Sequence, residues 1–156
     1  MEAGSILTKP ALICSAEDSI AVAGIRLREN GGSIVLVVNW EGTLIGTVTA
    51  GDLQRTTPNP DQSSEIPVTR IMSGDPHTCH YMDKLTDAEG IMGDYQLEQI
   101  PVVNESYQPL GILTRTEVQR SIREIEKEIS HPHWLVRIML AIFRFRTTGS
   151  APATAC

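Results

Sequence analysis

The segment GTVTAGDLQR at residues 46–55 recurs as GILTRTEVQR at residues 111–120. The offset of 65 positions continues without a gap over roughly fifty residues, which identifies an internal repeat. The matched positions are apolar, acidic and turn residues in the same order: Ile6 and Ile71, Cys14 and Cys79, Asp18 and Asp83, Ala23 and Ala88, and VVN at 37–39 and 102–104. The repeat predicts two copies of one folding unit.

The two copies are separated by a linker and followed by a C-terminal extension. Copy one covers residues 5–57, the linker residues 58–69, and copy two residues 70–129. The linker begins with PNPDQSS, which is polar and breaks helices. Beyond copy two, residues 131–146 are predicted to form an amphipathic helix, and residues 147–156 a disordered tail.

Each copy is predicted to fold as strand, helix, strand, strand and helix. In copy one, residues 11–14 and 34–38 are apolar runs typical of buried strands, and residues 44–49 are the return strand. Between the first two strands, Ile20, Ala23 and Leu27 recur at helical spacing and predict a helix over residues 19–30. Copy two repeats this order, with strands at 100–103 and 110–114 and a longer final helix at 116–129.

Neither copy is long enough to be stable on its own. A unit of about fifty to sixty residues buries too little surface, so we expect the two copies to share one core. The fold class is therefore α+β, an α/β sandwich of tandem β-α-β-β-α repeats with pseudo-twofold symmetry. Such pairing predicts two symmetry-related clefts between the sheets.

Composition narrows the class of protein. The chain has 13 Lys and Arg against 19 Asp and Glu, a net charge of −6, which excludes a uniformly basic protein and predicts no sequence-specific nucleic-acid binding. Its 3 cysteines are widely spaced and odd in number, which favours a reducing, cytoplasmic setting over a disulfide framework. The first residues, MEAGS, show no basic region before an apolar run, so we expect no targeting segment.

One family shows the same order of motifs. Copy one opens with LTKP at residues 7–10 and SAEDSI at residues 15–20. Further along, it contains VVN at residues 37–39, LIGTVT at residues 44–49 and DL at residues 52–53. This pattern resembles the CBS domain, named after cystathionine β-synthase, over residues 5–57 and 70–123. Two tandem copies resemble a Bateman module. The resemblance implies a non-catalytic homodimer that senses AMP, ADP, ATP or S-adenosylmethionine, requires no cofactor, and regulates a protein that the sequence does not identify.

The family's nucleotide motif can be read in both copies. It consists of Gly, an apolar residue, any residue, Thr or Ser, two further residues, and Asp or Asn. Copy one has Gly46, Thr49 and Asp52, with Thr in the apolar place. Copy two has Gly111 and Thr114 but ends in Glu117.

The spacing also has a physical meaning of its own. Thr49 ends a strand and Asp52 opens a helix, so both side chains are expected at one edge of a cleft. A carboxylate can accept hydrogen bonds from ribose hydroxyls, and a hydroxyl with the helix amides can meet a phosphate. Glu117 would place its oxygens about 1.5 Å further out. The alternative is that Thr49 and Asp52 only cap the helix.

The rest of the expected site rests on the resemblance. It implies an apolar adenine slot from Ala11 and Ile34 in copy one, with His77 and Gln99 at the matching places in copy two. Phosphates need positive neighbours, and Arg115 and Lys9 are the nearest candidates in sequence.

A metal site and a catalytic site are the alternatives to a nucleotide site. In HTCH at 77–80, a strand would place at most two ligands on one face, so buried structural residues are favoured over a metal site. No base and nucleophile pair emerges, so we do not expect an enzyme.

The C-terminal extension differs from the body in charge. Residues 131–156 contain three Arg and no acid, and apolar residues from Trp134 to Phe145 recur on one helical face. This face could pack on the module or on a second copy, or residues 134–146 could lie on a membrane surface or dock into a partner. The alternative function is therefore a ligand-independent dimerisation or interaction scaffold that presents this basic helix.

Overall fold

The computed structural model describes residues 1–7, 10–56 and 65–130. These residues belong to two compact units. Met1–Arg120 holds repeat one and repeat two up to the start of its last helix, and Ser121–Cys156 is described for residues 121–130. The predicted helix at 131–146, the predicted tail at 147–156 and Lys9 lie outside the described residues.

The elements of repeat one follow the predicted order. They are strand β1 (Ile13–Ser15), helix α1 (Ile20–Asn30), strands β2 (Ile34–Val38) and β3 (Leu44–Thr49), and helix α2 (Ala50–Thr56). Helix α1 ends where predicted because Gly31 adopts a left-handed conformation, with φ of 59°, that other residues rarely take.

Repeat two has the same order with two short additions before it. The additions are the 3-10 helix η3 (Val68–Arg70) and strand β4 (Ser73–Gly74), and a further 3-10 helix, η1 (Ala3–Ile6), precedes repeat one. The repeat itself consists of β5 (Cys79–His80), α3 (Leu85–Asp94), β6 (Gln99–Val103), β7 (Pro109–Thr114) and α4 (Arg115–Ser130). Of the predicted strand at 77–80, only Cys79 and His80 are extended.

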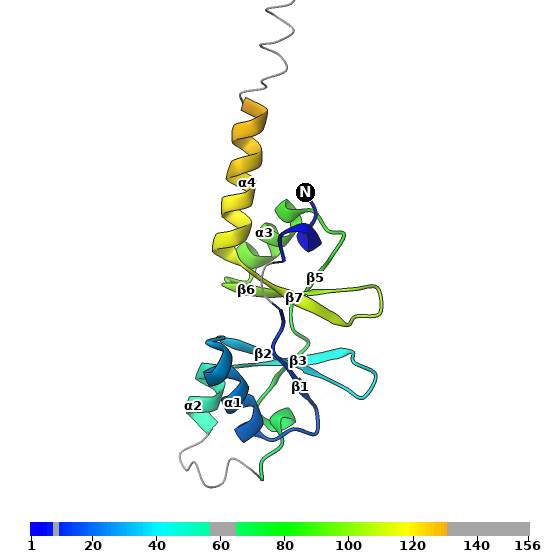
Figure 1. Ribbon diagram of the computed structural model, residues 1–156, viewed down its shortest axis with the longest axis vertical. Coiled ribbons are helices and arrows are strands. Elements are labelled where there is room, and N and C mark those ends of the chain that lie inside the picture. Colours follow the sequence, from blue (N-terminus) through cyan, green and yellow to red (C-terminus); the bar gives the residue numbers. More distant parts are fainter. Residues whose placement is uncertain (8–9, 57–64, 131–156) are drawn as a thin grey trace, which may run out of the picture. The chain divides into compact units, whose positions relative to one another are not determined.

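The strands form two sheets, in the orders β1-β2-β3-β4 and β5-β6-β7. In each sheet the first strand is parallel to its neighbour and the next pair is antiparallel. Both antiparallel pairs carry an irregularity at the same place, between Val37 and Val38 in one sheet and between Val102 and Val103 in the other. The α+β class and the tandem repeat are thus confirmed (Figure 1).

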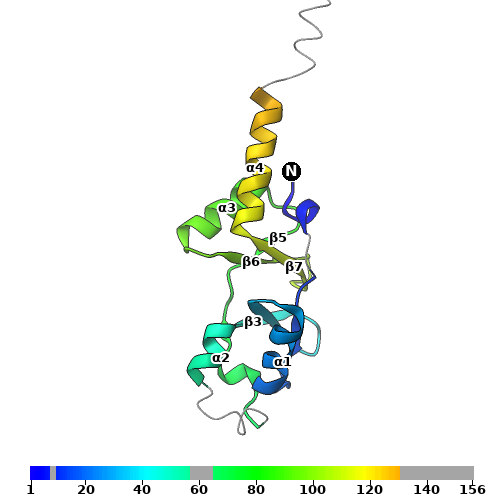
Figure 2. The same cartoon turned by 60° about the vertical axis from the view of Figure 1, so that its left-hand side comes forward.

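Strand β2 is buried on both faces. Val35 and Val37 pack with Ala23 and Leu27 of α1, which lies with α2 on one side of this sheet (Figures 1 and 2). Leu36 points to the other face and packs with residues of both repeats. They are Leu44 and Val103, with Ala11, Ile34 and Ile112 partly buried beside them. This second cluster is the shared core that the repeat predicted.

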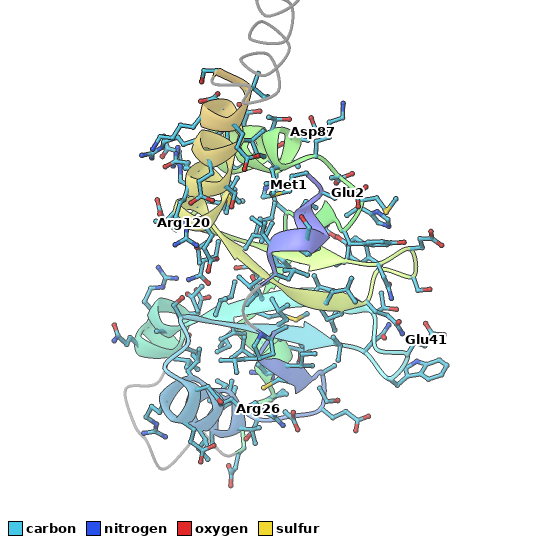
Figure 3. All side chains as sticks on the ribbon, turned by 45° about the horizontal axis from the view of Figure 1, so that its top comes forward. Met1, Glu2, Arg26, Glu41, Asp87 and Arg120 are labelled. Carbon is cyan, nitrogen blue, oxygen red and sulfur yellow. The ribbon has the colours of Figure 1, made fainter. Side chains whose placement is uncertain are left out.

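The segments that lead into each repeat pack on the other repeat. Val68 donates its amide to the Asp18 carbonyl over 2.8 Å, and Ala3 donates to the Asp83 carbonyl over 2.8 Å. These contacts are equivalent at the offset of 65. Met1 and Glu2 lie beside the start of α3, the helix that carries Asp87 (Figure 3), and the Met1 carbonyl accepts the Leu85 amide over 3.2 Å. The repeats therefore exchange their leading segments.

Strand β4 explains the glycine of the repeated motif. Gly46 pairs with Gly74, and a Cβ added at Gly46 would lie 2.6 Å from the Met72 sulfur and 2.9 Å from the Ser73 carbonyl oxygen. Real Cβ atoms do not approach other atoms this closely, so a side chain here would displace β4. Glycine is required because Met72 and Ser73, in the segment before repeat two, lie directly against this position of β3.

In the part of the chain that the structure describes, no helix combines the length and the apolar character that crossing a bilayer requires.

Candidate functional site

A cavity of about 660 Å³ opens where β3 ends and α2 begins. We call it cavity one. Residues Thr47, Thr49, Ala50 and Gly51 line it from repeat one, and residues 73–77 and 96–99 line it from the segment before β5 and the start of β6. Its volume lies within the range of sites for small ligands, roughly 300–1,000 Å³.

Cavity one groups the predicted residues differently from the expectation. Thr49 shares it with His77 and Gln99 of repeat two and with Ile34 of repeat one, whereas Ala11 belongs to the apolar cluster around Leu36. The expected slot for Thr49 was Ala11 and Ile34 of its own copy. The structure regroups these residues because the two sheets face each other, so the strand end of one repeat lies opposite the strand starts of the other.

Thr49 and Asp52 make a reciprocal cap at the start of α2. The Thr49 amide and hydroxyl donate to Asp52 Oδ2 over 2.8 and 2.9 Å, and the Asp52 amide donates to Thr49 Oγ1 over 3.3 Å. Arg55 Nη2 lies 2.6 Å from Asp52 Oδ1. Thr49 lines cavity one, whereas Asp52, in the first turn of α2, is not among its lining residues and holds Thr49 in place.

The cap changes the acidity of Asp52. Partial burial alone would raise the pKa of this carboxyl, but the hydrogen bonds from Thr49 and the Arg55 guanidinium outweigh it. The pKa of Asp52 is therefore lowered from its ordinary value of 3.8, and the ionised form is favoured.

Repeat two builds the same cap with a longer side chain. The Thr114 amide and hydroxyl donate to Glu117 Oε2 over 3.1 and 2.7 Å, and the Glu117 amide donates to Thr114 Oγ1 over 3.3 Å. The extra methylene of Glu117 is thus taken up without loss of any of these bonds. In both repeats the Thr and acidic pair fixes the junction between strand and helix.

A second cavity, of about 310 Å³, lies at the equivalent place in repeat two, and we call it cavity two. Thr114 and Ile112 line it from β7, and Pro10, Leu12 and residues 30–34 line it from repeat one, with Gln99. At the offset of 65, His77 corresponds to Leu12, and Leu12 rather than Ala11 forms the wall. The repeat therefore produces two related cavities, of which cavity two is about half as large.

An aromatic pair stiffens one wall of cavity one. The rings of His77 and Tyr95 are stacked, with centroids 3.7 Å apart and planes at 22°. Near them, the Gln99 side chain donates to the Ser33 hydroxyl, which joins the wall from repeat two to the wall from repeat one. Flat groups and amide edges of this kind suit a heteroaromatic ring.

Of the two predicted cations, the structure describes Arg115. Arg115 donates its amide to the Glu98 carbonyl over 2.9 Å, and its guanidinium lies 3.9 Å from the Glu98 carboxylate. Glu98 lines cavity one. Arg115 is not among the lining residues but contacts Glu98. The placement of Lys9 is outside the described residues.

The two internal cysteines are core residues. Cys14 and Cys79 are both buried, and burial raises the pKa of each thiol, that of Cys79 to about 12. A thiol held protonated is a poor nucleophile and a poor metal ligand. Within residues 1–7, 10–56 and 65–130, no three His, Cys, Asp or Glu side chains gather as a metal ion would require.

Two acidic residues of cavity one, Asp75 and Glu98, were not predicted from the sequence. Asp75 precedes Pro76 in the segment that leads into β5 and has a left-handed backbone, with φ of 48°. The signal that could have found them was the offset itself. At the offset of 65, Ser33 and Ile34 correspond to Glu98 and Gln99, and Pro10 corresponds to Asp75.

The architecture and the two cavities define a tandem-repeat module with related ligand-sized sites between its repeats. The family model of the CBS domain matches residues 3–57 and 68–124. The chain therefore belongs to the CBS-domain family, as a CBS pair or Bateman module.

A curated enzyme is among the proteins to which the chain is similar. The chain is 31% identical over 116 residues to inosine-5′-monophosphate dehydrogenase of Korarchaeum cryptofilum, a match that covers 74% of this chain and 23% of the relative. The chain thus spans about a quarter of the length of the curated relatives it matches.

Two solved structures share the fold. The CBS domain pair of protein MJ0100, in complex with 5′-methylthioadenosine and S-adenosyl-L-methionine, has a TM-score of 0.66 and 22% identity, covering 80% of this chain and 97% of that one. CBSX2 of Arabidopsis thaliana, in complex with AMP, has a TM-score of 0.65 and 22% identity, covering 80% and 98%. At these identities the likeness shows the fold.

Proposed function

We propose that this chain is a non-catalytic regulatory module that binds an adenosine compound in cavity one. The observation that carries the proposal is the composition of that cavity, which has Thr49 of one repeat on one wall and His77 and Gln99 of the other repeat on the opposite wall. The structural neighbours in complex with S-adenosyl-L-methionine and with AMP support the same ligand class.

Contact with both repeats gives the ligand a means of regulation. A ligand that contacts both walls stabilises the arrangement of the two repeats in which both contacts can form. It can shift the protein toward that arrangement only by as much as its affinity differs between the two states. A partner that prefers one state would then respond to the ligand.

Isothermal titration calorimetry tests the proposal directly. The full chain is titrated with adenosine, 5′-methylthioadenosine, S-adenosylmethionine, AMP, ADP and ATP, and we expect heat from at least one of them. Thr49→Val should weaken this binding about tenfold, because it removes a hydroxyl from the wall of cavity one.

The repeat supplies a matched control. Thr114→Val removes the equivalent hydroxyl beside cavity two and breaks the same kind of cap, so it should leave the affinity nearly unchanged. Absence of heat from all six compounds would reject the proposal. Equal losses in the two variants would reject the assignment to cavity one.

The scaffold is a second candidate because several large apolar side chains are exposed, and two of them are more exposed than the other described ones. Trp40, in the turn between β2 and β3, is 88% exposed, and Ile129 near the end of α4 is 71% exposed. In this alternative the chain forms a homodimer and presents residues 131–146 to a partner. Sedimentation of the full chain against a 1–130 truncation tests it, and an unchanged oligomeric state would remove the role of those residues in assembly.

A further inference from the structure

Cavity one carries negative charge on the wall that repeat two provides. Asp75 and Glu98 both line it, and its described lining residues include no Lys or Arg. The nearest described cation at this wall, Arg115, is directed to Glu98 at 3.9 Å and so offsets part of one charge.

Charge on this wall matters most for the part of an adenosine compound that varies. Adenosine, 5′-methylthioadenosine and AMP share the same base and ribose and differ at the 5′ position, which is neutral in the first two and carries a phosphate in the third. A phosphate brought into cavity one would lie near two carboxylates, and the like charges would repel one another. A neutral or positively charged 5′ group meets no such repulsion.

We propose that cavity one selects adenosine compounds whose 5′ group is uncharged or cationic and discriminates against 5′-phosphates. This inference rests on the proposed function and specifies its ligand class as nucleosides, thioethers and sulfonium compounds. Asp75 and Glu98 are the specificity-determining residues. Both side chains are largely exposed, so the discrimination against AMP is modest, about five- to tenfold relative to adenosine.

Titration of the full chain with adenosine and AMP at two salt concentrations tests the proposal. At 0.1 M salt AMP should bind about five- to tenfold more weakly than adenosine. The gap should close at 1 M salt, because the Debye length falls from about 10 Å to about 3 Å. S-adenosylmethionine, whose sulfonium is cationic, should bind at least as tightly as 5′-methylthioadenosine.

Two substitutions and one control assign the effect to these residues. Glu98→Gln should raise the affinity for AMP about fivefold or more, because it removes one carboxylate and frees the Arg115 guanidinium to meet the phosphate. Asp75→Asn should raise it about threefold, since Asn tolerates the same left-handed backbone. Glu41→Gln removes an equal charge at the hairpin turn outside cavity one (Figure 3) and should change nothing.

The results separate this inference from the proposed function. If AMP or ATP binds as tightly as adenosine at 0.1 M salt, the charge selection is wrong while the proposed function stands. If Glu41→Gln raises the affinity for AMP as much as Glu98→Gln does, net charge rather than cavity one is responsible and the inference fails. If none of the compounds binds, the proposed function fails and this inference fails with it.

Discussion

Cavity one and cavity two are built from equivalent positions of one repeat, yet they differ in volume and charge. Their volumes are about 660 and 310 Å³. Where cavity one has Asp75 and Glu98, cavity two has the uncharged residues Pro10 and Ser33. Both cavities keep a Thr on the wall and an acidic cap beside it. The repeated motif therefore builds the junction, and the opposite repeat supplies the residues that differ between the two cavities.

The largest effect is expected at Gly46, the glycine of β3 that pairs with Gly74 of β4. Gly46→Ala should lower the free energy of unfolding by about 1–3 kcal/mol, because the added Cβ meets Met72 and the backbone of Ser73. It should also disturb cavity one, since Ser73 and Gly74 line it. Urea denaturation measures the first effect.

Gly90→Ala is the control for this substitution. Gly90 lies in α3 with open space around its Cβ position, so alanine should stabilise the protein by about 0.5–1 kcal/mol. A loss of stability at Gly90 equal to that at Gly46 would mean that the close approach of β4 is not the cause.

The next largest effect on stability is expected at the two caps. Asp52→Ala and Glu117→Ala should each cost about 1 kcal/mol of unfolding free energy, because each removes the acceptor for the amide and hydroxyl of its threonine. Thermal or urea unfolding of both variants gives the comparison. A cost confined to Asp52 would contradict the equivalence of the two junctions.

The smallest effect concerns pH. The pKa of Asp52 is lower in the folded chain than its ordinary value of 3.8, so its contribution to stability is present above that value. It is lost as the pH falls toward and through the folded pKa. Asp52→Asn should therefore lose less stability than the wild type between pH 5 and pH 2, by about 1 kcal/mol or less. Parallel curves for the two proteins would contradict this assignment.

The predictable parts of this fold are those with a local signal. The run from Ile34 to Val38 predicted β2 because both of its faces are buried, and the helical spacing of Ile20, Ala23 and Leu27 predicted α1. Strand β4 and helices η1 and η3 were not predicted, since elements of two to four residues have no periodicity to detect. Their partners also lie in the other repeat, which no local pattern reports.

Part of the lining of cavity one could be predicted from the sequence, but the grouping of its residues could not. Thr49, His77, Gln99 and Ile34 were all expected, and the structure places all four on cavity one. Which of them share a wall depends on how the two sheets face each other, and that is a property of the shared core around Leu36 and Val103 rather than of any motif.

A crystal structure of the full chain with 5′-methylthioadenosine tests the central claim most directly. The account predicts the nucleoside in cavity one, in contact with Thr49 on one side and with His77 and Gln99 on the other. A nucleoside bound only against Leu12 and Thr114 in cavity two, or only within one repeat beside Ala11, would contradict it.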